Sequence, residues 1–311
     1  MLAETLSMTP VARAQFIRDR LPAEGLFEGQ LWRISPDPFP LEPEVAAELE
    51  SLGRVLLQFY RALNLLYQQS VAGKQPAWVA EYLDRGKPPE LIELQRSPAF
   101  KNDLPRVIRP DVLLTENGLS ISELDSVPGG IGLTAWLNEV YSELDQARND
   151  DAPSSFTEAS SDANGLATAP ASAKHQRSRP VLNPRARVIG GADGMLRGFE
   201  SIFSDAAKAH IVVSEEAATY RPEMAWVADR LNHGRFQVRD GSFDAAAPGD
   251  AVYRFFELFD LPNVPGSRAL LDQARQQHLR ITPPPKPALE EKLMFALLWN
   301  RHLREFWRWN L

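Results

Sequence analysis

The chain has 311 residues, with 34 lysines and arginines against 41 aspartates and glutamates, so that its formal net charge is −7. This length and a hydrophobic content of 44% indicate one large globular domain or two smaller ones. The acidic balance argues against a general nucleic-acid-binding protein, because phosphate backbones require a basic surface. Cysteine is absent, which excludes disulfides, thiolate metal sites and a cysteine nucleophile.

The sequence shows no sign of a membrane or secretory segment. No stretch approaches the ~20 apolar residues that span a bilayer. The first residues lack the charged-then-apolar pattern of a signal peptide. We therefore expect a cytoplasmic protein with neither a membrane nor a nucleic-acid partner.

Residues 1–100 are expected to be mainly helical. The clearest helix is predicted over residues 43–70, where apolar residues recur at alternating steps of three and four. One or two further helices are predicted over residues 76–95, interrupted at Gly86 and at prolines 88–89.

Residues 101–150 are expected to hold a β-hairpin and a glycine-rich turn. Two runs of β-forming residues flank positions 116–118, and Asn-Gly between such runs is a strong hairpin signal. A three-residue loop there, with Gly118 at positive φ, places Thr115 opposite Leu119. A two-residue loop would shift this register.

With that register, three carboxylates converge at the open end of the hairpin. Asp111 lies opposite Glu123, and Asp125 follows two residues later on the same face. Like charges so close require a shared proton, a basic side chain or a cation, and all-oxygen ligands favour Mg²⁺. Arg109 points to the same side as Asp111 and could hold a phosphate or a carboxylate. The alternative is solvated surface carboxylates with a salt bridge to Arg109.

A glycine-rich turn follows the hairpin and precedes a helix predicted over residues 133–144. Backbone amides at such a place can bind an anion, so that Gly129, Gly130 and Gly132 are candidate positions for contact with phosphate or substrate. A simple strand-to-helix turn accounts for these glycines equally well.

The second half of the chain begins with a change in composition. Residues 151–185 have almost no large apolar side chains, and we expect a disordered linker or insertion there. An α/β rhythm over residues 186–285 then predicts a Rossmann-like domain with a parallel sheet. Its predicted elements are strands at 211–213, 236–238 and 252–256 and a helix at 223–231. The fold class expected for the chain is α/β.

Residues 286–311 are expected to form a C-terminal helix, which we predict over 289–311. Lys286 lies on the proline-rich approach and Lys292 on the first helical turn, so that both could reach the same phosphates; ordinary surface lysines are the alternative. Trp307 and Trp309 require cover, which docking of the helix on its own domain would supply. If they are exposed, we expect self-association through this helix.

Taken together, these features resemble the glutathionylspermidine-synthase type of circularly permuted ATP-grasp protein. The resemblance rests on Arg-Pro-Asp at 109–111, Glu-Leu-Asp at 123–125 and the Pro-Gly turn after it. A Rossmann-like region at 209–256, in which Arg254 and Glu257 look like the family's strand-end residues, and a stretch rich in proline and lysine follow in the family's order. Asp125 stands where the family often has asparagine.

The resemblance implies an ATP-grasp-like fold and a carboxylate–amine ligase that uses ATP and Mg²⁺. A small-molecule carboxylate would be activated as an acyl phosphate and attacked by an amine. The resemblance implies magnesium binding by Asp111, Glu123 and Asp125, charge stabilisation by Arg109 and phosphate contacts by Lys286 and Lys292. In the family the main ATP-grasp subdomains come after the helix with which this sequence ends. We therefore expect residues 286–311 to begin a missing subdomain and the chain alone to bind ATP weakly.

Two other classes of function stay open. One is a non-catalytic protein that binds a ligand or a partner without turnover. The other is a Rossmann-like nucleotide-binding protein unrelated to ligases, which the absence of a GxGxxG fingerprint makes weaker.

Overall fold

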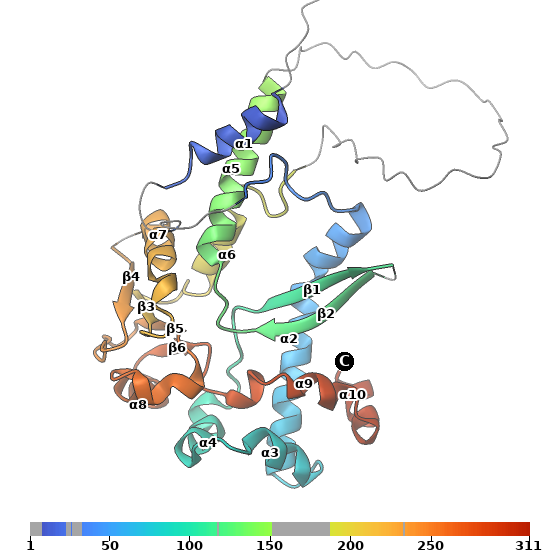
Figure 1. Cartoon of the computed structure of the whole chain (residues 1–311). Coiled ribbons are helices and arrows are strands. Elements are labelled where there is room, and N and C mark those ends of the chain that lie inside the picture. The colour runs from blue at the N-terminus through green and yellow to red at the C-terminus, as the bar shows by residue number, and fades with distance from the viewer. Residues whose placement is uncertain (1–7, 23–25, 27–32, 117, 151–186, 233) are drawn as a thin grey trace, which may run out of the picture.

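A four-stranded parallel sheet organises one half of the molecule. The computed structural model describes residues 8–22, 26, 33–116, 118–150, 187–232 and 234–311, so that the linker expected at 151–185 lies outside the described residues. The strands are β3 (Ala209–Val213), β4 (Phe236–Asp240), β5 (Ala251–Phe255) and β6 (Arg280–Thr282), in the order β4-β3-β5-β6 (Figure 1). All three pairings are parallel, which confirms the predicted parallel sheet.

Helices cover both faces of this sheet, which is the usual arrangement for parallel strands. On one face, α5 (Ile131–Asp150), α6 (Gly194–Ser201) and α7 (Arg221–Asn232) pack against alternate residues of β3 and β5. On the other face, α8 (Ser267–Arg275) and Phe100 pack against Val212 and Val252. A short helix, α1 (Pro10–Arg18), packs on α5 through the buried side chain of Ile17. The chain is thus an α/β protein, as expected.

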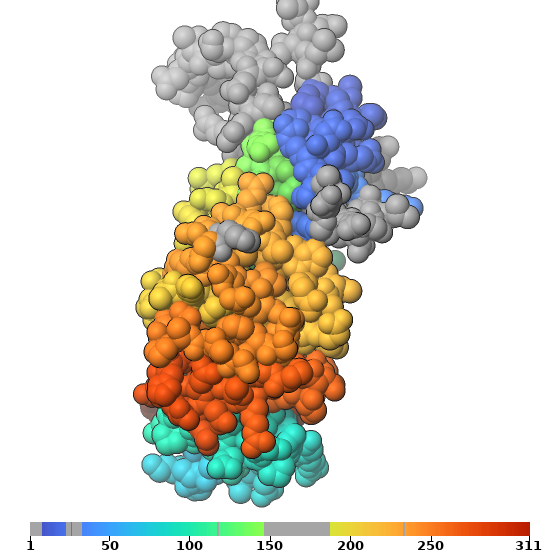
Figure 2. All heavy atoms as spheres, turned by 90° about the vertical axis from the view of Figure 1, so that its left-hand side faces the viewer, coloured from blue at the N-terminus to red at the C-terminus, as the bar shows by residue number. Residues whose placement is uncertain are grey.

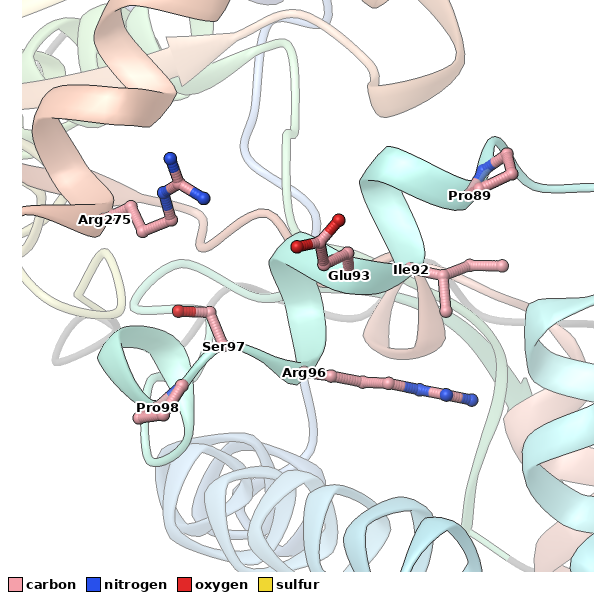
Figure 3. A pocket seen from close by; sticks show the side chains of 7 residues that line it. All are labelled: Pro89, Ile92, Glu93, Arg96, Ser97, Pro98 and Arg275. Carbon is pink, nitrogen blue, oxygen red and sulfur yellow. The ribbon is translucent and has the colours of Figure 1, made fainter.

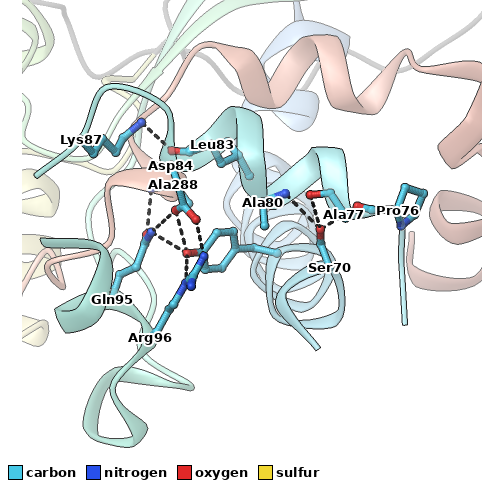
Figure 4. Close-up of polar contacts among 11 residues, drawn as sticks. Ser70, Pro76, Ala77, Ala80, Leu83, Asp84, Lys87, Gln95, Arg96 and Ala288 are labelled. Atoms are coloured by element: carbon cyan, nitrogen blue, oxygen red, sulfur yellow. Dashed lines mark hydrogen bonds and ion pairs between the residues drawn. The ribbon is translucent and has the colours of Figure 1, made fainter. Parts of the chain in front are cut away.

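The other half is built around the long helix α2 (Pro43–Val71), which confirms the helix predicted there. Its apolar face packs against α3 (Ala77–Asp84), and α4 (Pro89–Arg96) follows after the predicted break. A hydrogen-bonded network then ties the three helices together (Figure 4). Tyr67 donates to the Asp84 carboxylate at 2.8 Å, and Gln95 donates to both of them at 2.7 and 2.8 Å. Within the described residues, no helix combines the length and the apolar character required to cross a membrane.

The hairpin and the C-terminal segment complete this half. Strands β1 (Arg109–Thr115) and β2 (Gly118–Asp125) pair antiparallel beside α2, which confirms the predicted hairpin (Figure 1). The buried residues 281–289 lead from β6 across to α2. Figure 2 shows red-orange residues, which precede the dark red C-terminal end, as a band between the orange sheet region and the blue-green helices.

The single C-terminal helix predicted over 289–311 is wrong. The chain instead forms α9 (Leu293–Leu298), a 3₁₀ turn and α10 (Arg304–Asn310), because the Asn300 side chain accepts from the amide of His302 and starts a new turn. The segment folds back, so that Trp307 stacks on Phe59 with ring centroids 5.9 Å apart and donates to the Leu297 carbonyl at 2.8 Å. Trp307 is therefore buried, as the docked alternative requires, whereas Trp309 is 86% exposed.

The two tryptophans provide a matched test of this packing. We expect Trp307→Ala to lower the free energy of unfolding by about 3–5 kcal/mol, because it removes a buried aromatic side chain and leaves a cavity. Trp309→Ala should change it by less than about 0.5 kcal/mol. Urea unfolding followed by circular dichroism measures both, and equal effects of the two variants would contradict the docked arrangement of α10.

Candidate functional site

Asp111 and Glu123 of the hairpin lie opposite each other as predicted, but the loop and the strand pairing that bring them together differ from the prediction. The loop is shorter than expected, because Thr115 pairs with Gly118. A one-residue bulge at Ser122 then offsets the shorter loop and restores the pairing of Asp111 with Glu123. Gly118 has the predicted positive φ, at 105°. The three-residue loop is thus wrong, whereas the pairing of the two carboxylates is confirmed.

Arg109 lies between two of the three carboxylates at the base of the hairpin. Its guanidinium forms ion pairs of 3.2 Å with Asp111 and of 3.2 Å with Asp125. It also donates to the carbonyl of Gly129 at 3.3 Å. The other oxygen of Asp125 accepts from the amide of Val127 at 2.8 Å, so that the hairpin base is fixed to the glycine-rich turn. Arg109 is 44% exposed and thus open to an incoming anion.

The third carboxylate is bound by a residue from the C-terminal segment. Residues 283–292, which we call the strap, run from the end of β6 past α2 to the start of α9. Lys292, at the end of the strap, forms an ion pair of 3.0 Å with Glu123. The preceding residue, Glu291, pairs with Lys87 at 2.5 Å. The structure therefore brings Lys292 to the acidic hairpin, although its partner Glu123 belongs to a strand far earlier in the sequence.

Lys286 does not lie beside Lys292 in this arrangement but is buried within the strap. Its ammonium donates to Asn64 at 2.9 Å and to the carbonyls of Lys101 and Asp103 at 3.0 and 2.8 Å. All three of its protons are thus used, and burial lowers the pKa of Lys286 to about 8. In this structure Lys286 fastens the strap to α2.

The glycine-rich turn brings backbone amides to an anion, and the chain itself supplies that anion. The buried carboxylate of Glu223 accepts from the amide of Gly132 at 2.9 Å. Burial raises the pKa of this carboxyl, while amides at residues 130–133, those of Gly130 and Gly132 included, oppose the shift. Close packing requires glycine here: a Cβ on Gly129 would lie 2.3 Å from the Tyr220 ring, and one on Gly132 would lie 2.6 Å from Glu223.

A second charged group lies at the carboxyl end of β5, where the connections leave β3 and β5 on different sides and ligands of such sheets bind. Arg254 is completely buried. Its guanidinium donates to the carbonyls of Phe256 and Pro283 and forms an ion pair with Glu290 of the strap. Glu257 lies two residues after the strand; burial raises the pKa of its carboxyl, and the charge of Arg254 opposes that shift. The positive charge of one buried arginine therefore acts on two carboxyl groups, those of Glu257 and Glu290.

Asp125 connects this group with the hairpin. Its charge helps to raise the pKa of Glu257, Glu290, Tyr60 and Tyr253, although burial is the largest cause for each. Buried hydroxyls normally have hydrogen-bond partners. Among the described residues, the buried hydroxyls without one are those of Tyr60, Ser126, Tyr253 and Thr282. Sequence reasoning missed Glu290 and both tyrosines, because nothing in their spacing separates them from core or surface residues.

A surface pocket lies away from these residues. It has a volume of about 570 Å³ and lies between α4 and Arg275 of α8 (Figure 3). Its two arginines already have partners, since Arg96 pairs with Asp84 and Arg275 with Asp272. Both arginines of the pocket are thus already paired, and the hairpin base, where charged groups of both signs converge, is the better candidate.

Comparisons with known proteins do not assign the site. No model of a known protein family matches the sequence, and a search of curated proteins finds no match. Within the described part of the chain, no three histidine, aspartate or glutamate side chains are grouped so that they could hold a metal ion by themselves. Magnesium commonly uses only one or two carboxylates together with phosphate oxygens, so the Mg²⁺ site stays a prediction.

Magnesium binding at the hairpin is testable through stability. A cation that binds only the folded protein stabilises it by about 2.7 kcal/mol at a hundredfold excess over its Kd. We expect Mg²⁺ to raise the thermal midpoint of the wild-type protein and to have no effect on Glu123→Gln. Glu116→Gln, at the exposed tip of the same hairpin, is the control and should respond like wild type. Equal protection of all three proteins would assign the effect to general charge screening.

Proposed function

We propose that this chain carries the substrate and phosphate side of an ATP- and Mg²⁺-dependent carboxylate–amine ligase with an ATP-grasp-like fold. The observation that supports it is the convergence of Arg109, Asp111, Asp125, Glu123 and Lys292 beside the carboxyl ends of β3 and β5. These residues lie on three separate segments, yet they form one group with acceptors for a cation and donors for an anion. A site for a magnesium-bound phosphate requires both.

The donor set fits Mg²⁺, because it consists of carboxylate oxygens without histidine or cysteine. One or two of Asp111, Glu123 and Asp125 would hold the ion together with phosphate oxygens, and the ion would neutralise charge on the phosphates. When the carboxylates turn to the cation, Arg109 and Lys292 lose their present partners. Each is then free to bind an anion: Arg109 the substrate carboxylate in a bidentate manner, and Lys292 a phosphate as a compact point charge.

The positions of these groups suit acyl transfer. Arg109 reaches both the hairpin base and the carbonyl of Gly129, so that an anion bound to it would lie beside the glycine-rich turn. A positioned guanidinium stabilises the negative charge that develops when an amine attacks an acyl phosphate. Arg254 is completely buried at this edge of the sheet, where it binds Glu290 of the strap.

A second candidate function is binding of an anionic ligand or partner without turnover. It is favoured by the ion pairs themselves, because Arg109 and Lys292 already pair with all three hairpin carboxylates without a metal ion. A protein of this kind would bind phosphate-bearing ligands whether or not Mg²⁺ is present.

Calorimetric titration with ATP separates the two candidates. The ligase proposal predicts binding that requires Mg²⁺ and is weakened at least about tenfold, or about 1.4 kcal/mol, in Asp111→Asn and in Lys292→Met. Lys74→Met, in the exposed turn after α2, should bind like wild type. Binding that is independent of Mg²⁺ supports the second candidate, and binding that is unchanged in both site variants contradicts the proposed site.

A further inference from the structure

The strap joins the sheet to the hairpin through a series of polar contacts. The Pro283 carbonyl accepts from Arg254, the Lys286 ammonium is bound near α2, and the Glu290 carboxylate pairs with Arg254. Lys292 then meets Glu123 only two residues after Glu290. Because Lys292 is 73% exposed, its own ion pair contributes little to holding it in place. The buried anchor at Glu290 is better suited to fix the backbone there.

We propose that Arg254 and Glu290 are positioning residues, whose buried contact holds the strap on the sheet edge, most firmly while Glu290 is protonated, and thereby places Lys292 against the hairpin in a manner that depends on pH. This positioning role rests on the proposed function in one respect only, that Lys292 binds a phosphate. Arg254 touches neither Lys292 nor the hairpin carboxylates among the contacts of the structure, so it acts through Glu290.

The pH dependence follows from the number of charges in the group. Glu290 faces Arg254 and Glu257 at the end of β5, Asp125 at the end of β2 and Tyr60 on α2. Arg254 carries one positive charge beside the two carboxyl groups of Glu257 and Glu290, and the charge of Asp125 adds to their repulsion. The group therefore retains a proton more readily than isolated carboxyls do. Burial and the neighbouring acids raise the pKa of Glu290 to about 7. Arg254 stays compensated when Glu290 is neutral, because Glu257 also faces it.

Because the pKa of Glu290 is raised in the closed strap, a higher pH favours opening of the strap. A strap that lifts off would return Glu290 to water, where its pKa is 4.5. Opening therefore releases a proton between these values, and it becomes more favourable as the pH rises through about 7. The equilibrium constant for opening should rise about tenfold between pH 6 and pH 8.

Hydrogen exchange of the strap amides measures this opening directly, without nucleotide. The amides of Leu289 and Glu290 in the strap, and that of Met294 just after it, donate to carbonyls of the strap. After correction for the intrinsic exchange rate, we expect wild type to exchange about tenfold faster at pH 8 than at pH 6. Glu290→Gln should be protected equally at both values, whereas Glu290→Ala should exchange fast at both. Glu291→Gln removes the same charge from the neighbouring surface pair and should keep the wild-type profile.

The outcomes separate the two proposals. The positioning role is overturned if wild-type protection does not change with pH, or if Glu290→Gln retains the wild-type profile. ATP-Mg²⁺ affinity is then compared at a single pH. If the exchange results hold and no protein binds ATP-Mg²⁺, the positioning role stands and the proposed function fails. If wild type and Glu290→Ala bind ATP-Mg²⁺ equally, the proposed function stands and the positioning of Lys292 is refuted.

Discussion

The burial of one arginine constrains the rest of this structure. Arg254 has no exposed surface, so that its charge and its N–H donors must be satisfied within the protein. The acceptors are the carbonyls of Phe256 and Pro283 and the carboxylate of Glu290. The first belongs to the sheet edge and the other two to the strap. Satisfying a single guanidinium therefore joins the α/β half of the molecule to the half built on α2.

The candidate site is a consequence of that junction. With the strap held at Glu290 and at Lys286, its end lies over the hairpin, and Lys292 meets Glu123. The hairpin base is in turn fixed to the glycine-rich turn by Arg109 and Asp125. The acidic groups at this junction are Asp111, Glu123, Asp125, Glu257 and Glu290. The cations paired with them are Arg109, Arg254 and Lys292. An edge with this charge balance is suited to a cation-bound anion rather than to a free anion.

Sequence patterns predicted the elements that depend on local chemistry. The periodicity of residues 43–70 gave the correct helix, and the pairing of Asp111 with Glu123 was correct although the loop was one residue shorter. The bulge at Ser122 offset the error in loop length, and nothing in the residue pattern around Ser122 predicts a bulge there. The C-terminal helix was wrong because Trp307 packs against a helix about 250 residues earlier. Glu290 was missed for the same reason: the arginine that buries it is distant in sequence.

Zero-length cross-linking tests the central claim, that the strap and the hairpin meet at one site in solution. A carbodiimide joins an amine to a carboxylate only when the two are in direct contact. We expect mass spectrometry to find a Lys292–Glu123 cross-link alongside a Lys87–Glu291 cross-link, which serves as the internal control. The control cross-link without any link from Lys292 to the hairpin would contradict the account.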